Sequence, residues 1–450
     1  MKEDSLDLAL DLADRVTRKA KTTGADQCDC YIETGRELAI KVRDGEIETI
    51  ERASFRGLGV RFFTGHRLGF GFTTDFSRQS LEDLVERCRA LAEAATPDPD
   101  AGIPEPHPVD CVDLEISDPA IDGIPLERKT EHLLACEAAA RAVDKRIQHF
   151  YSAAYEERKG RIVIARMDSE PISYDSTTFE TFCAPIAEEA GEKRMGIWAS
   201  DARFFEDLES AALTGQTAAR RALAMLGAKT PRTCKLQVVF DPLAGTEVVA
   251  EIFGALDGER VTKGMSFLRD RIGQKAGSDA ATFVDDGRIV RKIGSRPFDA
   301  EGIPTKRVAA IDKGTVKSYF FDYRSAAKAG ASPTGNARRG FSSVPGVGEN
   351  NFYLIPGKTS RDDLLGRIEE GLLVTRMIGF GVNLTTGDFS RGAEGLWIKN
   401  GRLAQPVDGI TVGGNLADML AGIETASDLR FFGRLGSPTF TVGQMTIAGE

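Results

Sequence analysis

The feature that most constrains the fold is a set of two-residue turns, each set between segments of alternating apolar and polar residues. Asp44-Gly45 separates residues 37–43 from 46–52, and Lys313-Gly314 and Asn400-Gly401 stand in similar settings in the second half of the chain. Such pairs supply the positive φ angles of tight hairpin turns, and alternation turns one face of each strand toward a core. The sequence therefore predicts antiparallel β-sheets in both halves.

Helical periodicity adds a second set of elements between the hairpins. A glycine-rich segment, 385–395, is predicted to be a loop, and Ser80 is predicted to cap the second helix. The predicted fold class is α+β, with two domains that are each an antiparallel β-sheet with flanking helices. The helices are expected at 5–23, 80–95, 126–143, 208–226, 243–257, 324–329, 360–373 and 416–422.

The chain has 450 residues, which is too long for one ordinary core, so more than one domain is expected. Residues 97–125 hold seven of the 18 prolines and are predicted to be an extended connection. Glycine and proline at 227–231 end a predicted helix. We therefore predict an N-terminal α+β domain at 1–228 and a more β-rich C-terminal domain at 229–450.

Composition narrows the function classes. The formal net charge of −10 and the interleaving of basic with acidic residues disfavour direct binding to nucleic acid. No apolar run approaches the roughly 20 residues that cross a bilayer, and no secretory signal is recognised, so a cytoplasmic protein is expected. The seven cysteines are scattered, and Cys28 and Cys30 are predicted to be core residues on one face of a strand.

The helix that follows Asp241-Pro242 resembles a zinc-peptidase helix that has lost its ligands. With histidine at 250 and 255 it would read as the motif HExxxH, but both positions are alanine, Ala250 and Ala255, and only Glu251 remains. A catalytic zinc needs about three protein ligands, and the chain has no histidine after His149 and no cysteine after Cys234. We therefore predict no metal at this helix. Alanine and glutamate are also simply good helix formers.

The segment 385–395 is the candidate substrate-binding site, through Asp388, Ser390, Arg391 and Glu394. Its glycines let the backbone approach a partner, and Arg391 could hold a peptide carboxylate through two hydrogen bonds. The alternative is a tight loop whose acidic residues and Arg391 only satisfy each other. Ser390 has no histidine in its half of the chain, so a Ser-His triad is disfavoured.

Six stretches of the chain resemble the TldD/PmbA family, whose members are called modulators of DNA gyrase. Because both histidine positions are alanine, the chain resembles the PmbA/TldE branch rather than the zinc-bearing TldD branch. The matching stretches are 43–48 (RDGEIE), 56–61 (RGLGVR), 295–302 (SRPFDAEG), 386–395 (TGDFSRGAEG), 409–416 (GITVGGNL) and 443–449 (GQMTIAG).

This resemblance implies a subunit of a cytoplasmic TldD/TldE-type zinc metallopeptidase that degrades or processes unfolded peptides in a closed chamber. In the family these include a microcin precursor and an antitoxin. It implies that this chain is inactive alone, that zinc belongs to a TldD-like partner, and that the chain pairs with that partner or with its own copy. Two alternatives stay open: a regulator that binds DNA gyrase or a toxin–antitoxin partner, and a peptidase with a non-zinc site.

Overall fold

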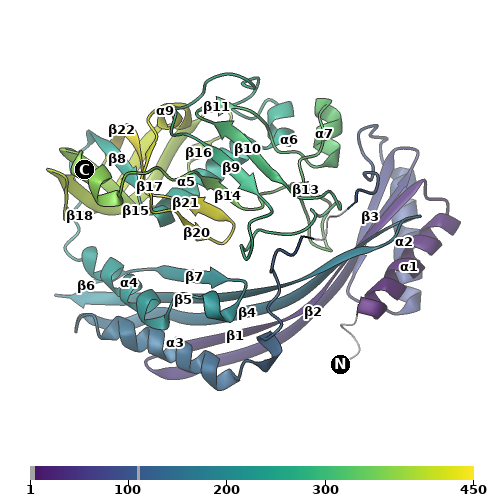
Figure 1. Cartoon of the computed structure of the whole chain (residues 1–450), viewed down its shortest axis with the longest axis horizontal. Helices are drawn as coiled ribbons and strands as arrows, with labels where there is room; N and C mark the ends of the chain where they lie inside the picture. Colours follow the sequence, from purple (N-terminus) through teal and green to yellow (C-terminus); the bar gives the residue numbers. More distant parts are fainter. Residues whose placement is uncertain (1–5, 109–111) are drawn as a thin grey trace.

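The computed structural model of the chain describes residues 6–108 and 112–450, so Ser5 and Cys111 lie outside the described residues. The α+β class is confirmed. In Figure 1 a long curved sheet from the first half of the chain forms one layer, and the C-terminal half lies above its concave face. Both faces of the long sheet are therefore covered, one by helices and the other by the C-terminal half.

The N-terminal sheet has the strand order β3-β2-β1-β4-β5-β6, with β7 paired to β5. Every pairing in it is antiparallel. Its strands are β1 (Gln27–Arg43), β2 (Glu46–Thr64), β3 (Arg67–Thr73), β4 (Ile147–Arg166), β5 (Ile172–Glu189), β6 (Glu192–Met195) and β7 (Trp198–Ala202).

Alternation along β1 explains how this sheet separates a core from a charged face. Even-numbered residues from Cys28 to Val42 include the apolar ones that pack beneath the helices, and Cys28 and Cys30 lie in that core as predicted. Odd-numbered residues include Asp29, Glu33 and Glu37, which turn to the opposite face. The covering helices are α1 (Leu6–Thr22), α2 (Arg78–Ala94), α3 (Leu126–Arg141) and α4 (Ala211–Ala224).

In the proline-rich segment 97–125, the residues that the structure describes are mostly irregular, as the prolines predicted. Short 3-10 turns lie at Ile121–Gly123 and Phe205–Asp207. The predicted cap of α2 is wrong by one turn: the side chain of Ser77 accepts a hydrogen bond from the backbone N–H of Ser80, so Ser77 is the N-cap. Asp75 fixes this start, because its carboxylate accepts hydrogen bonds from both the backbone and the hydroxyl of Ser77.

Two larger sheets form the C-terminal half. One has the order β15-β8-β22-β18-β17-β16, with β19 paired to β22, and the other has the order β11-β10-β9-β14-β21-β20. The pairs β8–β15 and β14–β21 are parallel, which hairpin turns could not reveal. The strands of the first sheet are β8 (Cys234–Phe240), β15 (Glu370–Ile378), β16 (Val382–Asn383), β17 (Asp388–Lys399), β18 (Arg402–Asn415), β19 (Glu424–Thr425) and β22 (Phe440–Ala448).

The second sheet and the remaining elements surround a shared core. A two-stranded pair, β12 (Ala337–Arg338) and β13 (Gly346–Val347), extends toward the N-terminal sheet. The second sheet contains β9 (Phe283–Asp286), β10 (Arg307–Asp312), β11 (Thr315–Val316), β14 (Phe352–Leu354), β20 (Arg430–Phe432) and β21 (Leu435–Ser437). The helices are α5 (Pro242–Ala255), α6 (Gly258–Thr262), α7 (Tyr323–Ala329), α8 (Arg361–Gly366) and α9 (Leu416–Ala421).

Two predictions in this half are wrong. The helix expected at 360–373 ends at Gly366, because Leu372, Leu373 and Val374 are fully buried in β15 between β8 and β17. The loop expected at 385–395 is mostly the start of β17, which pairs with β18 from Asp388 onward. In both cases tertiary pairing outweighed the local signal, helical spacing in one and glycine content in the other.

Candidate functional site

Helix α5 begins where the sequence predicted. The carboxylate of Asp241 accepts a hydrogen bond from the backbone N–H of Ala244 at 2.8 Å, and Pro242 occupies the first turn. Asp241 also forms an ion pair of 2.6 Å with Arg221 of α4. The start of the helix is therefore tied both to its own backbone and to the N-terminal half.

Only some residues of the altered zinc motif lie on the open side of α5. Glu247, Ala250, Glu251 and Gly254 form a partly exposed stripe at helical spacing. Ala255 instead is fully buried in the core cluster, and its carbonyl accepts a hydrogen bond from the hydroxyl of Ser266 at 2.5 Å. The second histidine position of the motif is thus packed with apolar neighbours and offers no empty ligand position.

An arginine from β17 faces the carboxylates of this stripe. Nη2 of Arg391 lies 2.6 Å from the Glu247 carboxylate, and the Arg391 side chain is 10% exposed. Burial raises the pKa of Glu251, while Arg391 and Arg260 oppose that shift. The sequence-based alternative, in which Arg391 is tied to Asp388 or Glu394, names the wrong partner. Asp388 lies on the opposite, exposed face of the strand, and Glu394 faces Arg376 instead.

The structure does not bring the four predicted substrate-binding residues together. Asp388 and Ser390 lie on the exposed face of β17, where Asp388 accepts a hydrogen bond of 2.6 Å from Thr386. Glu394 lies at a bulge in the strand, 3.6 Å from Arg376, and burial raises its pKa. Along one strand, side-chain alternation thus divides a set that a flexible loop could have gathered.

No group of three or more histidine, cysteine, aspartate or glutamate side chains is placed to hold a metal ion in residues 6–108 and 112–450.

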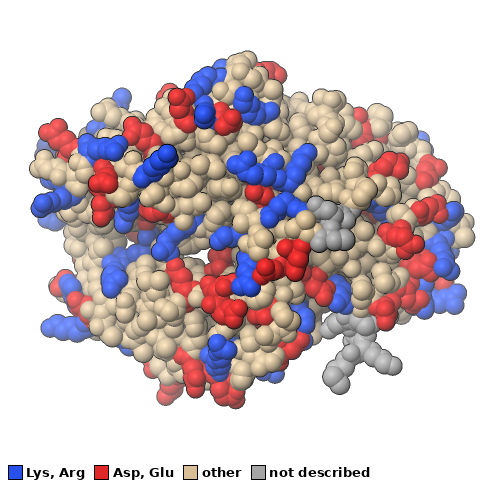
Figure 2. All heavy atoms as spheres, viewed as in Figure 1, with Lys and Arg blue, Asp and Glu red and all other residues tan. Residues whose placement is uncertain are grey.

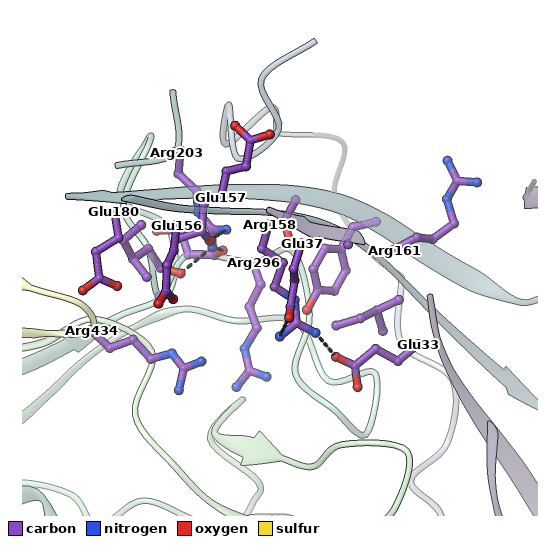
Figure 3. Close-up of a pocket in the computed structure, with 18 of the residues that line it drawn as sticks. Glu33, Glu37, Glu156, Glu157, Arg158, Arg161, Glu180, Arg203, Arg296 and Arg434 are labelled. Atoms are coloured by element: carbon purple, nitrogen blue, oxygen red, sulfur yellow. Dashed lines mark hydrogen bonds and ion pairs between the residues drawn. The ribbon is translucent and has the colours of Figure 1, made fainter. Parts of the chain in front are cut away.

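A second candidate site is a cavity of about 580 Å³ between the N-terminal sheet and the C-terminal half. Figure 2 shows an opening between the halves with acidic side chains along its lower edge. In Figure 3 Glu33, Glu37, Glu156 and Glu180 point from the sheet into the space beneath it, whereas Glu157 points to the other side of the sheet. Arg296 and Arg434 reach into the same space. The lining includes Tyr31, Glu33, Glu37, Glu156, Glu180, Tyr174, Arg158, Arg296, Arg338 and Arg434.

Sequence reasoning missed this cavity, although a signal for it exists. The cavity face of β1 carries Glu33 and Glu37 at alternate positions, opposite an apolar face. Charged residues along one face of both strands of a long hairpin indicate a solvated face. Which distant segment covers that face depends on the topology of the fold. The arginines that cover it come from residues 296, 338 and 434, which local patterns could not assign to one wall.

Models of a known protein family match this chain along most of its length. Three family models match successive parts of the chain: "PmbA/TldA metallopeptidase domain 1" at 28–92, "PmbA/TldA metallopeptidase central domain" at 119–226, and "PmbA/TldA metallopeptidase C-terminal domain" at 233–449. The chain belongs to the PmbA/TldD family. The resemblance seen in the sequence motifs is confirmed.

Individual relatives match along almost the entire chain. Metalloprotease PmbA of Escherichia coli O157:H7 is 29% identical over 100% of this chain and 96% of its own length. A candidate modulator of DNA gyrase from Bacteroides thetaiotaomicron has a solved structure that is 25% identical, with a TM-score of 0.89 and 98% of each chain covered. TldE from Thermococcus kodakarensis shares the fold, with a TM-score of 0.87 at 19% identity over 97% of this chain and 99% of that one.

Across the part of the chain that the structure describes, no helix is both long and apolar enough to span a bilayer.

Proposed function

We propose that this chain is the PmbA/TldE-like subunit of a cytoplasmic zinc metallopeptidase complex that degrades or processes unfolded peptides. The observation that carries the proposal is helix α5, in which Glu251 keeps the position of a general base while Ala250 and Ala255 stand at the ligand positions. Two alanines offer no donor atoms for zinc. The metal of the complex then belongs to a TldD-like partner, and this chain contributes a binding surface rather than a metal site.

An apolar surface beside this helix supports assembly through the C-terminal half. Phe380 is fully exposed, and Ile378 and Met265 are each almost half exposed. The backbone N–H of Phe267 donates to the carbonyl of Leu384 at 2.7 Å, so the two segments that carry these residues lie side by side. Large apolar side chains gathered on a surface mark a site of protein association, and a TldD-like subunit or a second copy of this chain would cover it.

The test is a peptidase assay with purified chain, a purified TldD-like zinc subunit, and an equimolar mixture, on an unstructured fluorogenic peptide. We expect cleavage by the mixture to exceed the sum of the two separate rates and to be abolished by a zinc chelator. Light scattering should show one complex in the mixture. Phe380→Asp should weaken the complex, whereas Leu403→Asp, at another exposed apolar position, should leave it unchanged.

Cleavage by this chain alone, sensitive to Glu251→Gln, would assign it a peptidase site of its own and contradict the proposal. A mixture that neither associates nor gains activity would contradict the subunit role, and a pull-down of gyrase by the chain would then favour the regulatory alternative.

A further inference from the structure

Three arginines of the C-terminal half form one wall of the cavity. Arg296 lies in the crossing between β9 and β10, Arg338 lies in β12 and Arg434 lies between β20 and β21. Burial lowers the pKa of Arg338 well below its usual range, and the charges of Arg296 and Arg434 lower it further. Because arginine stays protonated in proteins, this wall places three like charges close together.

The hydrogen bonds of this arginine cluster (Arg296, Arg338 and Arg434) are incomplete. Arg296 is only 7% exposed, and its Nε donates to Oδ1 of Asn350 at 2.9 Å. Its Nη2, although buried, has no partner among the described residues. A buried N–H without an acceptor is rare and unfavourable in a folded protein. Figure 3 shows the Arg296 and Arg434 side chains both reaching into the space below the sheet.

Among the described residues, Glu349 supplies the ion pair of the cluster, and that pair is weak. Its backbone carbonyl accepts from Nε of Arg338 at 2.6 Å. Its carboxylate lies 3.8 Å from Nη1 of Arg434, with both side chains partly exposed. A contact of this length does not satisfy the guanidinium groups, which leaves room for a better placed anion.

Asp285 and Asp299 lie close enough to the cluster for its charges to act on their pKa values. Burial raises the pKa of Asp285, and the charge of Arg338 opposes this shift. Burial likewise raises the pKa of Asp299, and the charge of Arg296 opposes it. The oxygens of both aspartates accept from amide and backbone donors instead.

Another arginine in the cavity shows what a purely structural guanidinium looks like. Arg203 donates to the backbone carbonyls of Thr177, Lys292 and Ser295, which join β5 to the crossing segment. Those carbonyls use all of its nitrogens, so it has no donor left for a ligand. Arg296 also lines the cavity, but it differs because its Nη2 has no acceptor among the described residues.

The opposite wall carries the opposite charge. Glu156 of β4 and Glu180 of β5 are direct cross-strand neighbours, and neither has an ion-pair partner in the described part of the chain. Burial raises the pKa of Glu180, and the negative charges of Glu156 and Asp201 raise it further. No arginine is among the groups that shift this pKa. The two walls therefore do not neutralise each other, and the space between them has a basic side and an acidic side.

We propose that Arg296, Arg338 and Arg434 form a subsite for a peptide carboxylate, with the amino end of the peptide directed toward Glu156 and Glu180. The choice of a peptide rests on the proposed function; the binding of a carboxylate does not. Guanidinium groups hold carboxylates through paired, charge-assisted hydrogen bonds. The cavity, at about 580 Å³, lies within the size range of small-ligand sites.

The carboxylate has two sources, a chain terminus or an acidic side chain, and calorimetric titration of the purified chain separates them. The probes are the hexapeptide Gly-Ser-Ala-Gly-Ser-Ala as free acid, the same peptide as C-terminal amide, and an amide with one serine replaced by glutamate. We expect the free acid to bind at least tenfold more tightly than the plain amide. Recovery of affinity by the glutamate amide would assign the subsite to side-chain carboxylates, and no recovery would assign it to chain termini.

Substitutions then locate the binding. Arg296→Gln should reduce the affinity for the free acid to that of the amide, and Arg434→Gln, at a partly exposed position, should do the same if the first variant folds poorly. Glu349→Gln should tighten binding, because it removes the competing carboxylate. Arg402→Gln, an exposed arginine at the start of β18, is the matched control and should bind as the wild type does.

Equal affinity for acid and amide, wild-type affinity in a folded Arg296→Gln, or no binding of any probe would overturn the subsite. None of these titrations needs a partner or cleavage. A chain that binds the free acid but never supports a peptidase would retain the subsite and lose the proposed function. A chain that supports cleavage but binds acid and amide with equal affinity would retain the proposed function and lose the subsite.

Discussion

At the scale of single residues, the altered zinc motif is less open than its sequence implies. Ala250 lies on the partly exposed stripe of α5, but Ala255 is completely buried. The sequence could show that donor atoms are absent, because that needs only residue identities. It could not show that the second position is filled by packing, because burial depends on how α5 meets the sheets around it.

We predict that Ala250→His combined with Ala255→His will not restore a zinc site. The imidazole at 255 must displace core side chains around a fully buried methyl group, and overpacking of this kind costs about 1–3 kcal/mol of stability or more. Metal analysis should find no stoichiometric zinc in either the wild type or the variant, and urea unfolding should show the loss. The single variant Ala250→His, on the open stripe, is the control and should keep its stability. One zinc per chain in the double variant would contradict this.

Arg391 is predicted to act on stability rather than on substrate. Its 2.6 Å ion pair with Glu247 is partly exposed on the glutamate side, so Arg391→Ala should cost about 1 kcal/mol. Glu247→Ala should cost a similar amount, and the double variant should lose less than the sum. Once assembled, a complex with the TldD-like partner should cleave at the normal rate. A tenfold slower rate in a fully assembled complex would return Arg391 to the substrate site.

At the scale of elements, the sequence predicted best where the signal was local. The Asp44-Gly45 hairpin, the start of α5 at Asp241 and the irregular proline-rich connection were all predicted correctly. It failed where pairing partners are distant: β15 pairs in parallel with β8, more than 130 residues earlier, and residues 388–395 became a strand. The four predicted substrate-binding residues lie apart for the same reason, because neighbouring side chains of a strand point to opposite faces.

The contact between α2 and β3 depends on a glycine. A Cβ at Gly69 would lie 1.7 Å from the carbonyl oxygen of Cys88 and 2.8 Å from the nitrogen of Ala92, both backbone atoms of α2. Gly69→Ala must therefore push the helix away and should destabilise the protein by about 1–3 kcal/mol. Gly366→Ala is the matched control: it lies in α8 with open space around it, and alanine there should add about 0.5–1 kcal/mol. Equal urea midpoints for the two variants would contradict this packing.

At the scale of the whole molecule, a buried ionic network joins the halves. Asp29 of β1 accepts hydrogen bonds from Arg61 at 3.0 Å and from Arg339 of the C-terminal half at 2.9 Å. Arg61 in turn lies 2.8 Å from Glu301. All four side chains are at most 5% exposed. The network therefore fixes the two walls of the cavity relative to each other.

Asp29→Asn should cost about 3–5 kcal/mol at pH 7, because it leaves buried arginines without their counter-charge. The cost should depend on pH. Although burial favours the neutral acid, Arg339 and Arg61 hold the pKa of Asp29 well below its usual range, whereas in the unfolded chain it is about 3.9. A depressed folded pKa means that the stabilisation is complete above the unfolded value and is lost as the pH falls below it.

Urea unfolding of both proteins at pH 7, 5 and 3.5 measures this dependence. The stability difference should be nearly constant from pH 7 to 5 and then shrink by about 0.7 kcal/mol at pH 3.5, since the unfolded wild type then binds a proton that the folded state refuses. Asp312→Asn, at the exposed last residue of β10, should show no such trend. A difference that stayed the same at all three pH values would mean that Asp29 contributes through its shape rather than its charge. The two halves would then be held together by packing such as that of Phe341 against Gly57 and Gly59.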